Sequence, residues 1–411
     1  MRRTCMKLLS VWKTTKPSFK TQPVKKPKEK KGKENSLVLQ NVERFLLAHY
    51  DFRYNVLRDV TEYCPKDSEE YNFVTVDQRE MNGLCLDARK AGIDCWDRDI
   101  SRFVHSNRIK PYHPFSTYMQ QLPVWDGTDR LEELAKRVSE NPVWVRGFHR
   151  WMLGLAAQWM EIDTLHANSV APVLVSRKQG KHKSTFCKLL LPEELKSYYT
   201  DSYDLNAQSS SEQKLTTFGL INLDEFDKFS ERKMTLLKNI MQMASINIRK
   251  AYKKSFSELP RVASFIATSN RIDLLTDPSG SRRFLCIEVE KKIDVATINH
   301  RQIYAQLKAE LEKGEQYWFN SEQEKEVMEN NKQFQRKNIA EDIFHSYFRI
   351  PQQGEKSELF SAAHIYEQLR KKHPSIMREV SAKHFGKDLL LLGAERIHTM
   401  SGNRYRLVSI S

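Results

Sequence analysis

The chain has 411 residues, of which 29% are charged, and its formal net charge is +15. This length allows two or three domains with at least one sizeable core. No apolar run approaches the ~20 residues of a membrane span, and the stretch Leu8–Trp12 is too short for the core of a signal peptide. The six cysteines show neither C-x-x-C pairing nor histidines at metal-site spacing. We therefore expect reduced thiols in a cytoplasmic protein without membrane contact.

The positive charge is concentrated at the N-terminus. Residues 1–35 contain 12 Lys or Arg and only 2 Glu, so they hold +10 of the +15. Lysines interspersed with Pro17, Pro23 and Pro27 cannot build a core, and we predict a basic disordered tail over residues 1–35. The excess charge favours an acidic partner, most economically nucleic acid. A solvated tail without a partner is the commoner case for such segments.

A mainly helical N-terminal domain is predicted over residues 36–140. Its apolar residues recur mostly at helical spacing, and one short stretch alternates like a strand. Gly92 stands where one of the helices should end, and Trp125-Asp126-Gly127 marks a turn near the end of the domain. The expected elements are a helix around 37–46, a strand at 52–57 and helices at 78–91 and 96–107.

Residues 141–295 are predicted to form an α/β core. A long apolar helix is expected first, over 144–160, and four short apolar runs follow it. Helical patterns lie between the runs, and polar groups come at their ends, which is typical of a parallel sheet with its site along one edge. The four runs are 171–175, 219–223, 261–268 and 284–289.

A basic loop joins the first run to a helix that opens with Lys183 and Ser184. This is the arrangement of a phosphate-binding loop, in which main-chain N–H groups face the anion, the lysine neutralises charge and the hydroxyl holds Mg²⁺. Aligned on Lys183, the two glycines of G-x-x-x-x-G-K-[ST] fall on Arg177 and His182, and only Gly180 supplies backbone freedom. Taken alone, the motif fits a basic strand–helix turn equally well.

Two acids, an asparagine and two arginines end the later runs or follow them. Asp224 would hold Mg²⁺ and Glu225 would polarise the attacking water of a nucleotide-hydrolysing site. Asn270 would orient that water or contact the γ-phosphate. Arg282 and Arg283 are candidate arginine fingers, because guanidinium donates in pairs to phosphoryl oxygens. Each group has an ordinary alternative (a solvated turn, a strand end, a surface ion pair), but their order and spacing together favour hydrolysis.

A basic hairpin is predicted between the second and third runs. Arg249, Lys250, Lys253 and Lys254 have aromatic residues interleaved with them there. This combination suits a nucleic-acid backbone with bases stacked beside it. A solvated hairpin face is the competing interpretation.

Beyond the core, residues 296–350 are predicted to be a helical connector. The final segment, 351–411, shows helical patterns over 362–372 and 382–391 and then two short strands, 395–398 and 404–407. Two helices followed by a strand pair suit a winged-helix-like C-terminal module.

These segments resemble the virulence-associated E (VirE-like) family, whose ATPase core is similar to the superfamily 3 helicases of phages, viruses and mobile elements. The resemblance covers roughly residues 40–290. It rests on HPFSTYMQQLPVWDGTDRL before the core, QGKHKSTF at the loop, LINLDEFD at the acids, and FIATSN followed by DPSGSRRF. The C-terminal segment also looks like the extra domain that accompanies this family in Bacteroidetes-type sequences.

The resemblance implies an AAA+-like P-loop ATPase that uses ATP and Mg²⁺. Such a protein is expected to assemble as a ring, with six copies as the expected number, and to move along DNA, with single-stranded DNA as the expected form. It assigns the loop roles to Gln179, Gly180, Lys183, Ser184 and Thr185, the acidic motif to Asp224 and Glu225, the sensor to Asn270 and the finger to Arg282 and Arg283. Relatives often carry a primase-like domain before this core. Only a basic segment of about 35 residues precedes the helical domain here. We therefore expect either a separately encoded primase as partner, or that the chain is a truncated derivative of such a relative.

The loop departs from the family pattern Q-G-x-G-K-S-T, because His182 stands where the second glycine belongs. A Cβ and an imidazole there would clash with the phosphates or force a strained backbone. Two functions therefore compete: an ATP-driven DNA helicase or translocase that replicates a mobile genetic element, and a catalytically weakened DNA-binding regulator or scaffold with the same ring fold. A small-molecule P-loop kinase fits less well, because it leaves Asn270 and the arginine pair unexplained.

Overall fold

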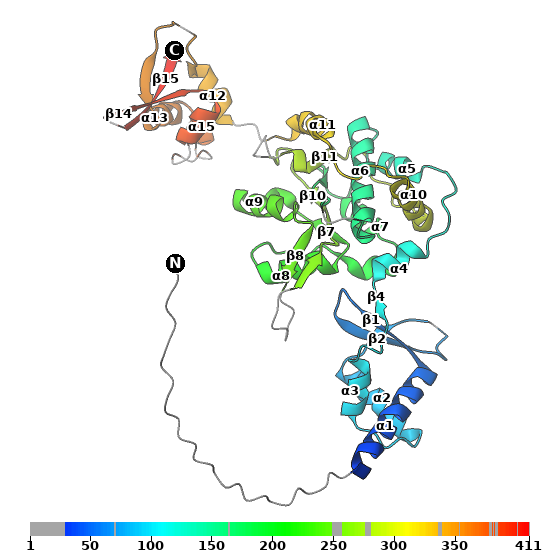
Figure 1. Cartoon of the computed structure of the whole chain (residues 1–411). Helices are drawn as coiled ribbons and strands as arrows, with labels where there is room; N and C mark the ends of the chain where they lie inside the picture. Colours follow the sequence, from blue (N-terminus) through cyan, green and yellow to red (C-terminus); the bar gives the residue numbers. More distant parts are fainter. Residues whose placement is uncertain are drawn as a thin grey trace, which may run out of the picture. The chain divides into compact units, whose positions relative to one another are not determined.

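The computed structural model of the protein describes residues 29–411 except 70, 163–164, 249–256, 276–280, 336–338, 353, 378–379, 381, 383–384, 401 and 411. The chain divides into two units, Met1–Tyr112 and His113–Ser411, and Figure 1 labels their elements. Within the described ranges, no helix is both long enough and apolar enough to cross a membrane.

The first unit packs three helices with a four-stranded sheet of order β3-β2-β1-β4. Strands β1 and β2 are antiparallel, and β4 runs parallel to β1. The core of this unit joins Val42 and Leu46 of α1 to Leu84 of α2 and Phe103 of α3. The elements are α1 (Glu29–His49), β1 (Tyr50–Asn55), β2 (Val60–Pro65), β3 (Val74–Thr75), α2 (Gln78–Lys90), α3 (Asp97–Val104) and β4 (Pro111–Tyr112).

This sheet corrects the expected mainly helical domain of residues 36–140. Strand β2 escapes the sequence pattern because Glu62 interrupts its apolar residues, yet Glu62 is buried and forms an ion pair of 2.7 Å with Arg53 on β1. The unit ends at Tyr112, and α1 begins at Glu29, inside the expected tail of residues 1–35. The rest of that tail, residues 1–28, lies outside the described residues.

The second unit is built on a five-stranded sheet of order β11-β5-β10-β7-β6, in which every neighbouring pair is parallel. The expected α/β fold with a parallel sheet is therefore confirmed, and β6 adds a fifth strand to the four expected ones. The chain passes from β5 to β6 at one edge and later returns to β11 on the other side of β5. A ligand site is expected at the carboxyl ends of the strands near such a reversal. The strands are β5 (Ala171–Val175), β6 (Tyr199–Thr200), β7 (Leu220–Leu223), β10 (Ser264–Ser269) and β11 (Phe284–Glu288).

Helices, short 3-10 turns and one strand pair connect the strands of this sheet. Strands β8 and β9 are antiparallel partners outside the main sheet. The connecting elements are α4 (Pro114–Gln120), α5 (Arg130–Lys136), α6 (Pro142–Trp159), α7 (Lys183–Leu189), η1 (Glu193–Tyr198), α8 (Gln208–Thr217), η2 (Phe226–Lys228), α9 (Glu231–Ile240), β8 (Ser245–Ile248), β9 (Ser257–Pro260), η3 (Ser281–Arg283), α10 (His300–Glu312), α11 (Ser321–Asn331) and η4 (Lys332–Phe334).

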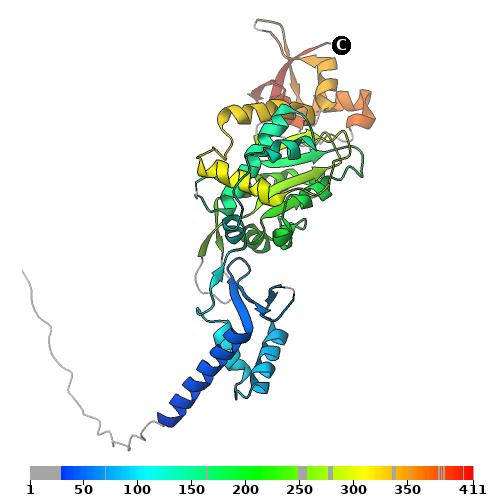
Figure 2. The same cartoon turned by 90° about the vertical axis from the view of Figure 1, so that its right-hand side faces the viewer.

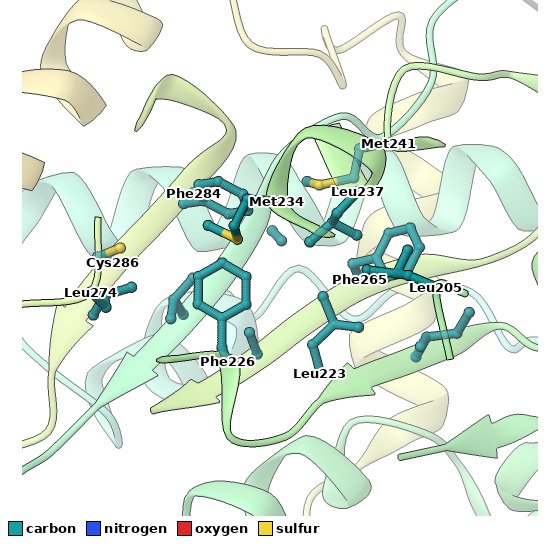
Figure 3. Packing of buried hydrophobic residues seen from close by; sticks show 14 of the residues in the cluster. Leu205, Leu223, Phe226, Met234, Leu237, Met241, Phe265, Leu274, Phe284 and Cys286 are labelled. Atoms are coloured by element: carbon teal, nitrogen blue, oxygen red, sulfur yellow. The ribbon is translucent and has the colours of Figure 1, made fainter. Parts of the chain in front are cut away.

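One face of the sheet is covered by α9, whose apolar residues recur at helical spacing. Leu237 and Met241 join a cluster that includes Leu223, Phe226 and Phe265, and Figure 3 shows these side chains gathered between α9 and the strands. Leu237 and Met241 are completely buried. Full burial of one such side chain stabilises the fold by about 1.5–3 kcal/mol, so this face holds the sheet together behind the site.

The opposite face is covered by α6, with α10 and α11 packed beside it (Figure 2). Gly147 of α6 lies so close to β11 that a Cβ there would be 2.7 Å from the Leu285 Cδ2 atom. Gly219, just before β7, approaches an aromatic pair in the same way: its Cβ would lie 2.5 Å from the Phe115 ring and 3.0 Å from the Trp159 Nε1 atom. Close packing on this face therefore depends on the missing side chains at these two positions.

Arg261, just after β9, is buried without a carboxylate among its hydrogen-bond partners. Only 2% of it is exposed. Its guanidinium donates to the carbonyl oxygens of Ile240 (3.0 Å), Met241 (2.9 Å) and Asn168 (2.8 Å), and to the Gln158 Oε1 atom (3.1 Å). Burial lowers the pKa of Arg261 to about 10, so the group stays charged at neutral pH. The Arg261 side chain therefore links the end of the β8–β9 pair to α6 and to the end of α9.

The C-terminal segment forms a module with its own core. Strands β12, β15 and β13 are neighbours in that order, and β14 pairs with β15. The expected helix at 362–372 and the expected strand pair are present as α13, β14 and β15. The elements are α12 (Ile339–Tyr347), β12 (Phe348–Arg349), β13 (Glu358–Ser361), α13 (Ala362–Lys372), α14 (Pro374–Met377), α15 (Phe385–Leu391), β14 (Glu395–Thr399) and β15 (Gly402–Ser409).

The expected helical connector of residues 296–350 is divided by the structure. Helices α10 and α11 pack on α6 of the core, whereas Phe344 of α12 packs with Ile365 of α13 and Leu407 of β15. Helix α12 therefore belongs to the C-terminal module. The sequence did not reveal this, because helical periodicity says which face is apolar but not which partner covers it.

Candidate functional site

The basic loop between β5 and α7 contains two residues with left-handed backbone. Gly180 has φ +76° and His182 has φ +62°. The main-chain O of His182 accepts the first bond of α7, from the Phe186 N atom at 2.9 Å. A left-handed non-glycine residue costs roughly 1–2 kcal/mol. Of the two expected consequences of His182, the structure has the strained backbone.

The imidazole of His182 has one unsatisfied ring nitrogen. Its Nδ1 atom is buried and has no hydrogen-bond partner among the described residues. Buried polar atoms are normally hydrogen-bonded. The hydrogen-bonding capacity of the His182 ring is therefore not met within the described residues.

Lys183, the first residue of α7, points inward to the end of the sheet. Only 8% of it is exposed, and its Nζ atom donates to the Ser176 Oγ atom at 2.9 Å and to the Asn270 Oδ1 atom at 3.0 Å. Both acceptors are neutral. Burial lowers the pKa of Lys183, and the nearby carboxylates of Asp224 and Asp227 act in the opposite direction. A buried ammonium at a helix N-terminus is suited to an anionic ligand.

The two predicted acids that follow β7, Asp224 and Glu225, have different hydrogen-bond and ion-pair partners. Asp224 accepts a hydrogen bond from the Thr268 hydroxyl on β10. Glu225 has φ +52°, and its carboxylate pairs with the Lys228 Nζ atom at 2.7 Å. Both side chains of this pair are more than half exposed, at 53% and 66%, so the pair is weak and easily broken.

Asp227 is a third acid of the site, and the sequence analysis assigned it no role. It accepts from the Ser269 Oγ atom at 3.0 Å and from the Asn270 main-chain N atom at 3.2 Å. Asn270 therefore contacts the loop through its side chain and the acidic segment through its main chain. The only sequence signal was the position of Asp227 three residues after Asp224 in LINLDEFD, which also fits a solvated turn.

The remaining predicted loop residues lie near the solvent. Gln179, Gly180 and Thr185 are exposed, and Ser184 is partly buried in the first turn of α7. A Ser184 hydroxyl and an Asp224 carboxylate fit Mg²⁺, which takes one or two protein oxygens and completes its shell with phosphates and water. In the described part of the chain, no group of three or more His, Cys, Asp or Glu side chains is placed to hold a metal by itself.

The arginine pair is held on α11. Arg282 and Arg283 form η3, and the Arg282 Nη1 atom lies 3.0 Å from the Glu324 Oε2 atom. The structure thus gives Arg282 a carboxylate partner on α11. The four basic hairpin residues, Arg249, Lys250, Lys253 and Lys254, lie outside the described residues, although the strands that flank them, β8 and β9, are paired.

The family model described as "Virulence-associated protein E-like domain" matches residues 119–336, more than half of the chain. A second model, described as a domain of unknown function from B. theta (DUF3874), matches residues 337–407. The boundary between the two matches falls between η4 and α12, where the structure separates the core from the C-terminal module. A comparison with curated proteins finds no significant match.

Several solved structures also match the chain. The apo C-terminal region of NrS-1 is 13% identical, with 91% of this chain and 99% of that chain covered and a TM-score of 0.43. An A-form apo structure of the same region is 12% identical, with 90% and 99% covered and a TM-score of 0.44.

Proposed function

The chain belongs to the virulence-associated protein E-like family, and we propose that it is an ATP-hydrolysing motor of helicase or translocase type that acts on DNA during replication of a mobile element. The observation that carries this proposal is Lys183. Its ammonium is buried at the carboxyl edge of a parallel sheet, its two hydrogen-bond acceptors are neutral, and the carboxylates of Asp224 and Asp227, which follow β7 of the same sheet, act on it from nearby. A triphosphate with its metal supplies the charge that this arrangement lacks.

Each polar group then has a role in nucleotide hydrolysis. Lys183 and the N–H groups at the start of α7 hold the β- and γ-phosphates. Ser184 and Asp224 hold Mg²⁺, which neutralises developing charge. Glu225 leaves its ion pair with Lys228 and accepts a proton from the attacking water. Asn270, fixed by Lys183 and Asp227, orients that water.

The proposal extends to the assembly and its partner. In a ring, Arg282 and Arg283 would serve the nucleotide of a neighbouring copy, as the family resemblance implies, with six copies as the expected number. Single-stranded DNA is the expected substrate, bound through the basic hairpin and the basic N-terminal segment. The C-terminal module would act as a winged-helix-like DNA or partner contact, and a separately encoded primase is the expected companion.

A second function, a DNA-binding regulator or scaffold with weak or no hydrolysis, is favoured by two specific observations. His182 places a side chain where the loop adopts a left-handed backbone, and Glu225 is already paired with Lys228. A strained loop opposes turnover, and Glu225 must leave Lys228 before it can act as the base. Such a protein would bind DNA with strong salt dependence and would be indifferent to changes at Lys183.

Hydrolysis of ATP by the purified full chain, measured with Mg²⁺ and with or without single-stranded DNA, tests the first function. We expect DNA-stimulated turnover that falls at least about 10²-fold in Lys183→Ala and in Glu225→Gln. Lys181→Ala and Glu231→Gln are matched controls: Lys181 donates instead to the Glu290 carbonyl at 2.6 Å, and Glu231 lies exposed at the start of α9. Wild-type protein without turnover in either condition would rule out the motor.

The same preparations distinguish the second function. A regulator is expected to bind single-stranded DNA equally well as wild type and as Lys183→Ala, and to hydrolyse no ATP. His182→Gly then separates two cases. If the variant gains turnover, the chain is a motor weakened at its loop; if it gains none, the loop no longer serves hydrolysis.

A further inference from the structure

Asn331, the last residue of α11, fastens the segment that carries the arginine pair. It is completely buried, with 0% exposed. Its Nδ2 atom donates to the carbonyl oxygens of Ser281 (2.9 Å) and Phe284 (2.6 Å), and its Oδ1 atom accepts from the Cys286 N atom (3.3 Å). One amide thus binds the main chain immediately before and immediately after Arg282 and Arg283.

The same helical segment also holds the start of this stretch of chain. The main-chain N atoms of Leu274 and Leu275 both donate to the Phe334 carbonyl oxygen at 3.1 Å. Phe334, in η4, is completely buried in the hydrophobic cluster beneath the sheet. The chain between β10 and β11 is therefore tied to α11 and η4 at both of the ends that the structure describes.

A different contact holds the Arg282 side chain. Its ion pair with Glu324 is partly exposed, at 42% and 29%, and such pairs are weak in water. It can break when a phosphate offers a better partner, since guanidinium binds phosphoryl oxygens in pairs. The Asn331 contacts are buried and go to main-chain groups, so they persist when the side chain moves.

We infer that Asn331 is the positioning residue for the arginine pair: it fixes the main chain from which Arg282 and Arg283 reach the nucleotide. This inference rests on the nucleotide hydrolysis proposed above. A group that stabilises charge in the transition state must be placed in advance, and a misplacement of about 1 Å costs about 10²-fold in rate. Loss of the Asn331 contacts therefore lowers turnover and leaves nucleotide binding, which depends on Lys183, intact.

The test is Asn331→Asp in the full chain, which keeps the side-chain volume and removes both N–H donors. We expect kcat for ATP to fall about 10- to 100-fold, with the Kd for a non-hydrolysable ATP analogue changed less than about threefold. Asn330→Ala is the matched control. The Asn330 side chain donates to the Cys286 carbonyl at 2.8 Å but to neither residue that flanks the arginines, so its kcat should stay within about twofold of wild type.

A double-mutant cycle decides whether Asn331 works through the arginines. In an Arg282→Ala, Arg283→Ala background, Asn331→Asp should cause no further loss of kcat, because effects transmitted through one group are not additive. If Asn331→Asp fails to fold, Asn331→Ser, which shortens the contact without burying a carboxylate, takes its place in the cycle. An additive loss, or wild-type kcat in both Asn331 variants, overturns this inference alone. Absence of hydrolysis by wild-type protein overturns it together with the proposed function.

Discussion

Asn270 accepts a hydrogen bond from the Lys183 ammonium at 3.0 Å. This contact joins the end of β10 to the start of α7 and crosses the carboxyl edge of the sheet. The acceptor is an amide oxygen, which carries no charge, so the lysine is oriented by it but not neutralised. The charge of Lys183 is therefore available to an anion.

Asn270→Asp should stabilise the protein and impair its loop. A carboxylate at this position would form an ion pair with Lys183, and the attraction added to the existing bond contributes up to about 1 kcal/mol after the desolvation of the carboxylate. The free energy of unfolding should therefore rise by about that amount. Nucleotide affinity should fall about tenfold, because the added negative charge repels phosphates. Urea unfolding and equilibrium binding of an ATP analogue measure the two effects.

Asn82→Asp is the control for this prediction. Asn82 lies exposed on α2 in the first unit, so the same chemical change there should alter neither quantity appreciably. A variant of Asn270 that loses stability and binding together would show that the amide is needed for the fold, and not for the charge of Lys183.

The two left-handed residues of the loop, His182 and Gly180, should change the free energy of unfolding in opposite directions when glycine is introduced at the first and removed at the second. His182→Gly removes the steric cost of φ +62° and should raise the free energy of unfolding by about 1 kcal/mol. Gly180→Ala, at φ +76° with no atom within 4 Å of the added Cβ, should lower it by a similar amount. Urea unfolding measures both. Equal stability of His182→Gly and wild type would mean that the imidazole repays its strain through contacts of its own.

Stability should depend on pH through Lys183. Burial holds its pKa below the ordinary value, whereas the unfolded chain keeps the ordinary value. Between the two pKa values the unfolded chain binds more protons, so the free energy of unfolding contributed by Lys183 rises with pH through that window. Below the window the lysine is protonated in both states and the cost of burying its charge is fully present.

Lys183→Met isolates this contribution. The variant should be more stable than wild type at neutral pH, and the difference should shrink as the pH rises into the alkaline window. Urea midpoints of both proteins, followed from neutral to alkaline pH, give the difference curve. Parallel curves would show that Lys183 does not change its proton affinity on folding.

Gly219→Ala should destabilise the core. The added Cβ would lie 2.5 Å from the Phe115 ring, and overpacking of this kind costs about 1–3 kcal/mol. The matched control is Gly83→Ala inside α2, where nothing lies within 4 Å of the new atom and where alanine should add about 0.5–1 kcal/mol. Both are read from urea unfolding, and a loss at Gly83 or a neutral result at Gly219 would contradict the packing described.

The sheet of the second unit was largely readable from the sequence. Four of its five strands are short, buried and mostly apolar runs separated by helices or turns, and a parallel sheet covered on both faces demands that pattern. The polar residues that end these runs were found for the same reason. The first unit was harder, because strand β2 carries Glu62, and the partner that makes this acid tolerable, Arg53, is on another strand.

The residues that hold the surrounding segments in place could not be predicted from the sequence. Asp227, Arg261 and Asn331 act through main-chain groups that are distant in sequence: Asn331, for example, binds the carbonyl of Ser281 fifty positions earlier. No local pattern marks such contacts, because a buried amide or guanidinium is recognised only when its partners are in place. The arginine pair was picked out by residue type, but its tie to α11 depends on a helix whose packing the sequence left open.

Arg261 has a consequence for how substitutions would be tolerated. Its fork reaches two separate segments, the end of α9 through the carbonyls of Ile240 and Met241 and the loop before β5 through that of Asn168. A lysine offers one compact ammonium and cannot span them, and an apolar residue abandons three buried carbonyls. A library of all substitutions at this position, scored for folded protein, should therefore leave arginine nearly alone, as strictly selected as any residue that touches the ligand.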